Sequence, residues 1–404
     1  MSNVISSRIV VPRRAHGGEM GLLDAIIVGA GPVGCHVAAG LAGRGHQVLV
    51  IEEHDQIGLP ARCTGLIGEQ AFARFDLPGA ATQRIVKSIR IYGPDGTWFH
   101  HRSERPLARV VSRPQLDAAL AARAAAAGAG FLLGRKVLGA QIEPKAVALT
   151  LAGSEHPLRA RSLVIATGAR GNLTEQLGLG RLCGYLFGVQ VETEVREVEE
   201  VEVYLGRELS PGSFAWVVPT IPGRARIGLS AYGHPRERLA LFLRDRRLQL
   251  RLVGPVPPPT VAPIPLGTLP ATVADRVLVV GEAAGQVKTT TGGGVYYGLL
   301  AAEIAAEVLG QALAAGNLGR ASLARYEATW RQLLGREIEY GLRLRRLARR
   351  LDDATLAFFL NLANRDGIKY LVGRLASFDW HASLVAALLD GPLRRSAVAV
   401  SSLD

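Results

Sequence analysis

The chain has little cysteine, few aromatic residues and no long uninterrupted apolar run. Its 404 residues include only Cys35, Cys63 and Cys183, too few for a disulfide scaffold and typical of a reducing cytoplasm. We expect Cys35 and Cys183 to be buried structural residues. No Cys or His pair has metal-site spacing, and every window of about 18 residues contains a charge or a turn former. The sequence therefore predicts neither a metal site nor a membrane-spanning helix.

Charge is strongly biased toward positive residues. The net charge is +12 and the pI is about 10.1, so the surface can attract nucleic acid, anionic lipid or an acidic protein. There is no nucleic-acid-binding motif, which leaves an anionic membrane, an acidic partner, or a basic composition that only keeps the protein soluble. Residues 1–23 lack a secretory pattern and are expected to form a disordered basic tail. We expect a cytoplasmic protein, with a peripheral place at the inner membrane surface as a further possibility.

The segment 24–52 has the pattern of a βαβ unit. Asp24–Val28 and Gln47–Ile51 are short apolar runs typical of buried parallel strands, and Pro32–Arg44 between them is small and apolar, as expected for a helix packed closely on a sheet. The turn that joins the first strand to the helix is glycine-rich, so the unit predicts a dinucleotide-binding fold.

Three glycines and one carboxylate carry the binding prediction. Gly29, Gly31 and Gly34 fit G-x-G-x-x-G, in which the first permits a tight turn, the second admits a pyrophosphate and the third allows close helix–strand packing. Glu52 ends the second strand, where a carboxylate can accept hydrogen bonds from ribose hydroxyls. An acid at this position disfavours NADPH as the resident nucleotide.

A second glycine-rich segment lies almost 250 residues later. The run 277–285 (VLVVGEAAG) is a strand entering a small-residue turn, and 286–295 (QVKTTTGGGV) leads into a long helix. This arrangement would place Glu282 beside a ribityl chain. The backbone N–H groups of Gly293, Gly294 and Val295 would lie under a flavin ring, where they can stabilise negative charge on its N1/O2 side. The two segments together indicate FAD rather than NAD.

The predicted fold class is α/β: a Rossmann-like FAD-binding domain with a parallel sheet, an inserted antiparallel β-sheet substrate domain and a C-terminal helical region. We assign residues 24–84, 108–175 and 271–315 to the FAD-binding domain, 85–107 and 176–270 to the β-rich domain, and 316–404 to the helical region. A single strand is expected over Ile85–Tyr92, and Ser112 is expected to cap the helix that follows it. Arg320–Arg350 should be an amphipathic helix with a dense arginine face, which is either a membrane-surface element or an ordinary solvated face.

Further blocks resemble the geranylgeranyl reductase family, within the flavoproteins shaped like p-hydroxybenzoate hydroxylase. They are 60–65 (PARCTG), 112–117 (SRPQLD), 164–168 (VIATG), 214–219 (FAWVVP) and 281–295 running into 296–300 (YYGLL). The family more often has Asp where this chain has Glu282, and its lipid-tunnel motif usually opens with Tyr where this chain has Phe214. The resemblance implies that FAD contacts come from Val33, Glu52, Arg62, Cys63, Thr64, Arg113, Val137, Glu282, Gly294 and Val295.

The resemblance also implies a reaction, in which reduced FAD saturates C=C bonds of a geranylgeranyl or other prenyl chain. Cys63 would lie near the flavin, where its thiol can tune the ring, donate a proton or only pack, and Trp216 would line the lipid tunnel or belong to the ordinary core. Tyr296, Tyr297 or an ordered water are other candidate proton donors. Since only one dinucleotide fingerprint exists, NADPH would bind transiently or another reduced carrier would supply the electrons. The expected partner is a prenyl lipid; the sequence predicts neither which lipid nor the oligomeric state.

Two other functions share the expected fold. A flavin monooxygenase or halogenase would use the same FAD contacts, but the halogenase W-x-W-x-I-P pattern appears only as residues 214–219 (FAWVVP), and 167–171 (TGARG) replaces the Asp-Gly common in hydroxylases. An electron-transfer dehydrogenase that feeds quinone would require an iron–sulfur partner, because three scattered cysteines cannot ligate a cluster.

Overall fold

The first layer of the fold is a sheet whose central strands are parallel. The computed structural model describes residues 22–365, 377–383, 385 and 386; the predicted basic tail lies outside them, except that residues 22 and 23 are described and Leu23 already belongs to β1. The strand order is β18-β19-β11-β1-β2-β8, and β19, β11, β1, β2 and β8 run parallel. The bounds are β1 (Leu23–Val28), β2 (Val48–Ile51), β8 (Gly130–Leu132), β11 (Leu158–Ile165), β18 (Val273–Ala274) and β19 (Val277–Val279).

Small side chains let three helices pack closely on one face of this sheet. The helices are α1 (Pro32–Ala42), α3 (Arg113–Ala126) and α7 (Val295–Ala314), and their core residues join Val48, Val50 and Val164 in one cluster. Ser112 occupies the N-cap position of α3, but its side chain makes no capping hydrogen bond. The other face packs with β9 (Val137–Ile142), β10 (Val147–Leu151) and the short α4 (Leu173–Gln176).

Helix α7 satisfies by length and composition the criterion for a membrane span, contrary to the sequence expectation. However, 72% of the apolar window is buried inside the protein. The helix lies between α1 and α8 (Arg320–Ala348), so its apolar character is that of a core helix.

The second layer is a mostly antiparallel sheet with the order β16-β12-β15-β14-β13-β5-β6, and β17 pairs with β12. Only β13 and β5 run parallel. The bounds are β5 (Ser88–Tyr92), β6 (Trp98–Arg102), β12 (Tyr185–Val195), β13 (Val201–Tyr204), β14 (Ala215–Pro219), β15 (Arg224–Ala231), β16 (Leu252–Val253) and β17 (Thr260–Pro265). Helices α5 (Pro235–Leu243) and α6 (Arg246–Gln249) cover its outer face. The parallel sheet, the inserted β-sheet and the C-terminal helices confirm the predicted fold class.

A small third sheet joins the two layers. It has the order β3-β7-β4, with β3 (Leu66–Gly68), β4 (Thr82–Val86) and β7 (Ala108–Val111), and helix α2 (Glu69–Phe75) follows β3. The single strand predicted over Ile85–Tyr92 is wrong: Lys87 separates β4 from β5, and the two strands belong to different sheets. Val86 of β4 and Ile89 of β5 pack in the same apolar cluster, so the chain changes sheet without leaving that cluster.

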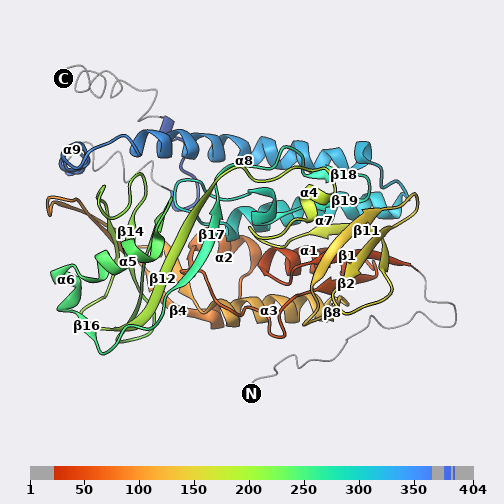
Figure 1. Cartoon of the computed structure of the whole chain (residues 1–404), viewed down its shortest axis with the longest axis horizontal. Coiled ribbons are helices and arrows are strands. Elements are labelled where there is room, and N and C mark those ends of the chain that lie inside the picture. The colour runs from red at the N-terminus through yellow and green to blue at the C-terminus, as the bar shows by residue number, and fades with distance from the viewer. Residues whose placement is uncertain (1–21, 366–376, 384, 387–404) are drawn as a thin grey trace.

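The long helix α8 connects the two halves of the molecule. Figure 1 shows it running along one side, past the parallel sheet at one end and the antiparallel sheet at the other, with α9 (Asp353–Ala363) beyond it. Its buried stripe includes Leu323, Tyr326, Trp330, Leu334 and Ile338 at helical spacing. Helix α8 therefore contacts the region where the two halves meet.

Candidate functional site

The turn after β1 contains two glycines that close packing requires and a third that borders open space. A Cβ on Gly29 would collide with the Ala166 carbonyl oxygen, and one on Gly34 would collide with the Gly29 carbonyl oxygen. A Cβ on Gly31 would meet nothing within 4 Å, so packing within the protein does not explain this glycine. Helix α1 begins here without a side-chain cap or an acidic residue in its first turn. Its free N–H groups and the open space at Gly31 fit a pyrophosphate.

Glu52 stands at the end of β2 beside the same turn. Its Oε2 accepts a hydrogen bond from Ala30 N at 2.9 Å, and its Oε1 lies 2.6 Å from His54 Nδ1. Its backbone is bonded to Leu132 and Arg135, which lead to β9. Val137 begins β9 and packs against the cluster on that side of the sheet. These residues can hold the adenosine end of a dinucleotide.

The late glycine-rich segment packs directly against the early turn. Val33 lies 3.2 Å from the position of a Cβ on Gly281, whose φ is +70°, and 2.5 Å from that of a Cβ on Gly298. Gly281 N donates to Gln286 Oε1 at 2.7 Å, and Gln286 Nε2 donates to Tyr326 Oη of α8 at 2.9 Å. Two segments far apart in sequence are therefore held side by side, as a ligand that spans both would require.

Two predicted residues, Glu282 and Arg113, lie close enough to interact electrostatically, and we call the region between them the crevice. Burial raises the pKa of Glu282, and Arg113 together with the Ala169 N–H opposes this shift. The Arg113 guanidinium pairs with Asp117 through two hydrogen bonds of 2.9 Å. Burial disfavours its charge, but Asp117 and Cys63 outweigh that effect and raise the pKa of Arg113. Glu282 also lies 3.1 Å from the position of a Cβ on Gly294, so residues from four segments meet here.

The loop 287–294 is clamped from behind by α8. Arg345 Nε donates to Thr289 O at 2.5 Å and Nη2 donates to Thr290 O at 2.9 Å, while Nη1 reaches Gly212 O at 3.1 Å. Arg345 is 4% exposed, so this arginine does not belong to the solvated face expected for the helix. The clamp fixes the backbone that leads into Gly293, Gly294 and Val295, and α7 begins at Val295 without a side-chain cap.

The loop that carries Cys63 is fixed by the antiparallel sheet. Arg226 of β15, 8% exposed, donates to Thr64 O at 2.6 Å and Val111 O at 3.0 Å. Thr64 Oγ1 donates to Gln190 Oε1 at 3.1 Å. Cys63 itself is half-buried, and its Sγ accepts a hydrogen bond from Gly65 N at 3.4 Å. The structure therefore brings Cys63 and Thr64 next to Arg113.

Arg62 differs from Cys63 and Thr64, which follow it, because it is exposed. Partial burial and the like charge of Arg170 lower its pKa, and Glu53 opposes this shift. Two arginines with no carboxylate bonded to either one, among the described residues, stand at the border of the crevice. This position suits an anionic group on a ligand.

Trp216 of β14 lies beyond Gln190 in the same sheet. A Cβ on Gly228, which lies between the two residues, would be 2.7 Å from both the Trp216 ring and Gln190 Cβ. The indole is 9% exposed, its Nε1 has no partner among the described residues, and Phe214 contacts its ring edge-on at 6.0 Å. It packs with apolar residues of the small sheet. Trp216 and Phe214 therefore belong to an apolar cluster that lies next to the Thr64 loop.

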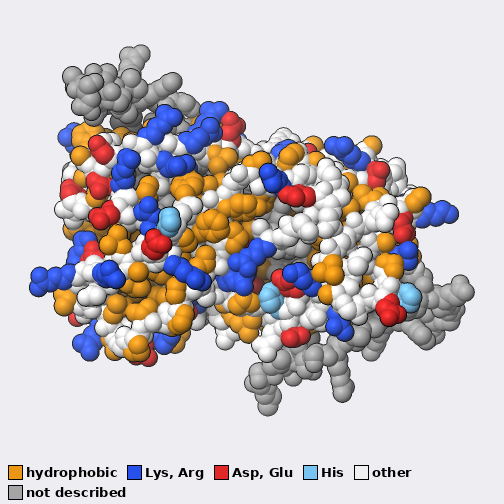
Figure 2. All heavy atoms as spheres, viewed as in Figure 1, with side chains coloured by type: hydrophobic (Ala, Val, Ile, Leu, Met, Phe, Trp, Pro, Cys, Tyr) orange, Lys and Arg blue, Asp and Glu red, His pale blue; other side chains and the backbone are white. Residues whose placement is uncertain are grey.

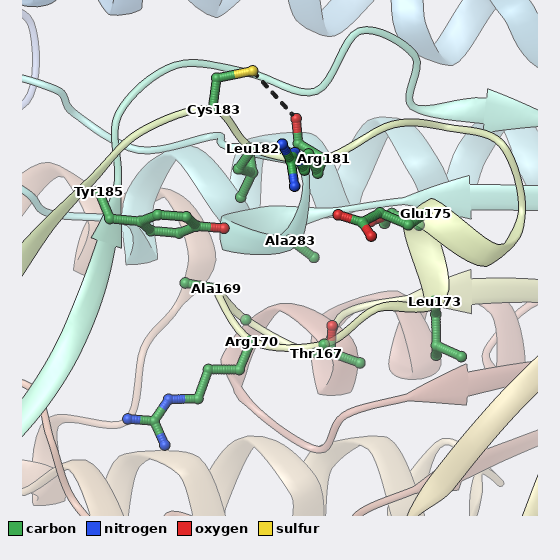
Figure 3. Close-up of a pocket in the computed structure, with 13 residues that line it drawn as sticks. Thr167, Ala169, Arg170, Leu173, Glu175, Arg181, Leu182, Cys183, Tyr185 and Ala283 are labelled. Carbon is green, nitrogen blue, oxygen red and sulfur yellow. Dashed lines mark hydrogen bonds between the residues drawn. The ribbon is translucent and has the colours of Figure 1, made fainter.

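A cavity of about 380 Å³ opens beside the crevice. Its lining includes Gly168, Glu175, Arg181, Tyr185 and Ala283. Figure 3 shows the Tyr185 hydroxyl and the Glu175 carboxylate directed into this space, whereas the Arg170 side chain extends away from it. The cavity shares the segments at 168 and 283 with the crevice, and its polar lining is of mixed charge.

The three cysteines have different environments. Cys35 is buried, as expected; its Sγ donates to Ala30 O at 3.3 Å, and burial raises its pKa. The same expectation for Cys183 is wrong, because Cys183 is exposed at the rim of the cavity described above. Cys183 lies on the connection from α4 to β12, which runs over the surface. The apolar residues on either side of Cys183 in the sequence do not reveal this exposure.

The two candidate tyrosines at the start of α7 face the core. Tyr297 Oη donates to Asp379 O at 3.0 Å, and burial raises its pKa, helped by the charges of Glu337 and Asp379. The Tyr296 ring packs edge-on against Phe75 and Trp380. Both residues pack among the helices, so Cys63 is the candidate proton donor that borders the crevice.

Comparison with known proteins defines the class of this fold and site. A family model described as lycopene cyclase protein matches residues 24–377. A digeranylgeranylglycerophospholipid reductase 2 of Methanothermobacter thermautotrophicus is 30% identical over 370 residues, 85% of this chain and 92% of that protein. The match to the family model extends over both sheets and α8. The class is that of FAD-dependent oxidoreductases.

Solved structures agree with this fold. A geranylgeranyl bacteriochlorophyll reductase-like protein of Thermoplasma acidophilum superposes with a TM-score of 0.82 at 21% identity, covering 95% of this chain and 99% of that one. A flavin-dependent brominase superposes with a TM-score of 0.69 at 17% identity, over 92% and 99% of the two chains. These structures share the fold, and the relative that is 30% identical over 85% of this chain shows that the chain belongs to the geranylgeranyl reductase family of flavoproteins.

Several residues that build the site were not found from the sequence. Arg226, Arg345, Gln286 and Tyr326 all act through contacts with partners far away in the chain. Asp117 is different, because its i, i+4 spacing from Arg113 is a readable signal for a pair on one helix face.

Proposed function

We propose that the protein saturates isolated C=C bonds in the prenyl chain of a lipid. The observation that carries this proposal is the apolar wall of Trp216 and Phe214, joined through Gln190 to the Thr64 loop of the cofactor crevice. An unactivated alkene offers no carbonyl to polarise, so the site must supply a close approach and exclude water. Bound FAD, when reduced, would supply the hydride.

The chain's own residues have three tasks in this proposal. Gly31, Glu52 and Glu282 hold the dinucleotide, and the clamped loop 287–294 orients its flavin end. The Trp216 wall guides the chain and keeps the site dry. Cys63, which lies beside Arg113, gives its thiol proton to the second alkene carbon, and solvent restores that proton.

The membrane and the electron donor complete the proposal. Figure 2 shows Lys and Arg side chains around apolar patches on the half that holds β12, β14 and α5. Exposed apolar residues of this half include Trp98, Phe187 and Leu250. This surface would bind an anionic membrane peripherally on the cytoplasmic side. NADPH or another anionic reduced carrier would approach through the cavity near Arg181.

The test uses anaerobic, chemically reduced holoenzyme mixed with geranylgeranyl diphosphate or a digeranylgeranyl phospholipid in liposomes, followed by mass spectrometry. The expected product is heavier by two hydrogens for each bond reduced. Trp216→Ala should impair this conversion while leaving FAD content unchanged, and Trp216→Phe, which keeps an apolar ring, should retain most of it. No mass gain with any prenyl lipid, together with oxygen-dependent hydroxylation or halogenation of an aromatic, would support the monooxygenase or halogenase instead.

A further inference from the structure

One buried ion pair of the described residues has no role in the proposed reaction. Lys288 Nζ lies 2.7 Å from Asp379 Oδ1, and the two side chains are only 6% and 2% exposed. Lys288 Nζ also donates to Phe378 O at 3.1 Å and lies 4.6 Å from the Phe378 ring centre. Desolvating two charges is costly even when they pair, so this pair calls for an explanation beyond stability.

The pair lies directly behind the loop that faces the flavin end of the crevice. A Cβ on Gly293 would be 2.8 Å from Lys288 Cε and 3.4 Å from Lys288 Nζ. On the crevice side of the same loop, a Cβ on Gly294 would be 3.1 Å from Glu282 Oε1. Lys288 N also donates to Gly293 O at 2.9 Å. The backbone of Gly293 and Gly294, which carries no side chain of its own, therefore lies between Lys288 on one side and Glu282 on the other.

The charges of the pair are poorly screened in this position. The second carboxylate oxygen, Asp379 Oδ2, is buried and has no hydrogen-bond partner among the described residues. Among those residues, Lys288 is therefore the one cation paired with the Asp379 carboxylate, through Oδ1. Burial lowers the pKa of Lys288, and Asp379 opposes this shift. Each charge consequently depends on the other, and removing one would leave the remaining one in a medium of low dielectric.

Other titratable groups around the pair are already satisfied. Glu337 of α8 accepts hydrogen bonds from His381 N and Ala382 N at 2.8 and 2.9 Å. Burial and the charge of Lys288 lower the pKa of His381, which keeps its ring neutral near pH 7. Tyr297 of α7 donates to the backbone of Asp379. Glu337 keeps its negative charge and also acts on Lys288. The Lys288–Asp379 pair adds no net charge to it, so neutralising Lys288 or Asp379 changes the charge behind the loop in opposite directions.

We propose that Lys288 and Asp379 are positioning residues that set the reduction potential of the bound flavin from behind the glycine-rich loop. The proposal rests on FAD binding at this loop and is independent of the lipid substrate. The backbone N–H groups of Gly293, Gly294 and Val295 would face the N1/O2 side of a bound flavin, where reduction adds negative charge. A buried cation nearby therefore favours the reduced flavin, and a buried carboxylate disfavours it. With both residues present, the reduction potential should lie between the value set by the cation alone and the value set by the carboxylate alone.

The test is an anaerobic redox titration of holoenzyme, followed by the flavin absorbance, with FAD content measured for each variant. Asp379→Asn should raise the potential by about 30 mV, a tenfold change in the two-electron equilibrium. This difference from wild type should shrink as pH rises, because the unpaired Lys288 gives up its proton. Lys288→Met should lower the potential, because the Asp379 carboxylate is then left without its cation. The double variant should return toward wild type.

The opposite signs distinguish this effect from loosening of the loop. A purely structural role would shift both single variants in the same direction or leave the potential unchanged, and either result overturns the proposal. Lys288→Arg, which keeps the charge, should retain the wild-type potential. If Asp379→Asn fails to bind FAD, Lys288→Gln against Lys288→Arg decides, since only the first should lower the potential. The exposed pair of Arg74 and Glu303 provides the control, and its neutralisation should leave the potential unchanged.

Discussion

The two glycine-rich segments of the crevice are built in different ways. The turn at Gly29–Gly34 is formed by elements that are consecutive in sequence. Gly34 packs against the backbone of Gly29 within the same turn, and Gly29 packs against the backbone of Ala166 after β11. The loop 287–294 is held by Arg345 of α8 and by Asp379 of the segment 377–383. The pyrophosphate end is therefore formed by one βαβ unit packed on the strand beside it, whereas the flavin end depends on tertiary contacts with the C-terminal region.

The strongest test of the local turn compares two glycines that are three residues apart. Gly34→Ala places a Cβ against the Gly29 carbonyl oxygen and should destabilise the protein by about 3 kcal/mol or prevent folding. Gly31→Ala meets no protein atom, so it should leave the melting temperature of the apoprotein unchanged while weakening FAD binding. Thermal melts and FAD titrations check both. An equal loss of stability in the two variants would contradict the assignment of Gly31 to ligand space.

The contrasting test removes the clamp on the distant loop. Arg345→Met should cost about 2–4 kcal/mol, because it removes hydrogen bonds to three backbone carbonyls inside the protein. It should also weaken the flavin end of FAD binding, seen as a shifted flavin spectrum. Arg343→Met is the matched control: this residue pairs with Glu339 on the exposed face of α8, and its loss should cost less than about 0.5 kcal/mol. Equal effects of the two variants on stability and on the flavin spectrum would contradict the role of Arg345 in holding the loop 287–294.

At the adenosine end, Glu52→Ala should reduce FAD affinity by about 1.5–3 kcal/mol, since charge-assisted hydrogen bonds to the ribose are lost. The variant also frees Ala30 N, which Glu52 bonds at 2.9 Å. Glu52→Gln keeps one acceptor and should lose less. Equilibrium FAD binding measures the difference, and an unchanged affinity in Glu52→Ala would place the adenosine elsewhere.

The smallest expected effect concerns the pH dependence of apoprotein stability. Burial raises the pKa of Glu282 above its ordinary value of 4.5, so the protonated form is the one favoured by folding. Its contribution is present below the unfolded-state pKa and is lost as pH rises through the folded-state pKa. Glu282→Gln should therefore gain stability relative to wild type as pH rises from about 4.5. Melting curves across this range check the prediction; a constant difference would show that the carboxyl is not perturbed.

The sequence was sufficient for elements whose signals are local. The βαβ unit, the glycine turn and the long helix after Gly294 follow from periodicity and turn chemistry. The split between β4 and β5 at Lys87 could not be seen, because both halves of that apolar run read as strand. Arg345 looked like one more arginine on an exposed face, since helical periodicity does not show that Thr289 and Thr290 lie opposite it. Whether the predicted contacts bind FAD as assigned stays a prediction.

The most direct measurement of the central claim is anaerobic stopped-flow reoxidation of the reduced flavin by a prenyl lipid. The account predicts recovery of the oxidised flavin spectrum with a geranylgeranyl lipid, with one two-electron oxidation for each bond saturated, and no recovery with the fully saturated analogue. Flavin that remains reduced with every prenyl lipid would contradict the account, as would reoxidation at equal rates by the unsaturated and saturated lipids.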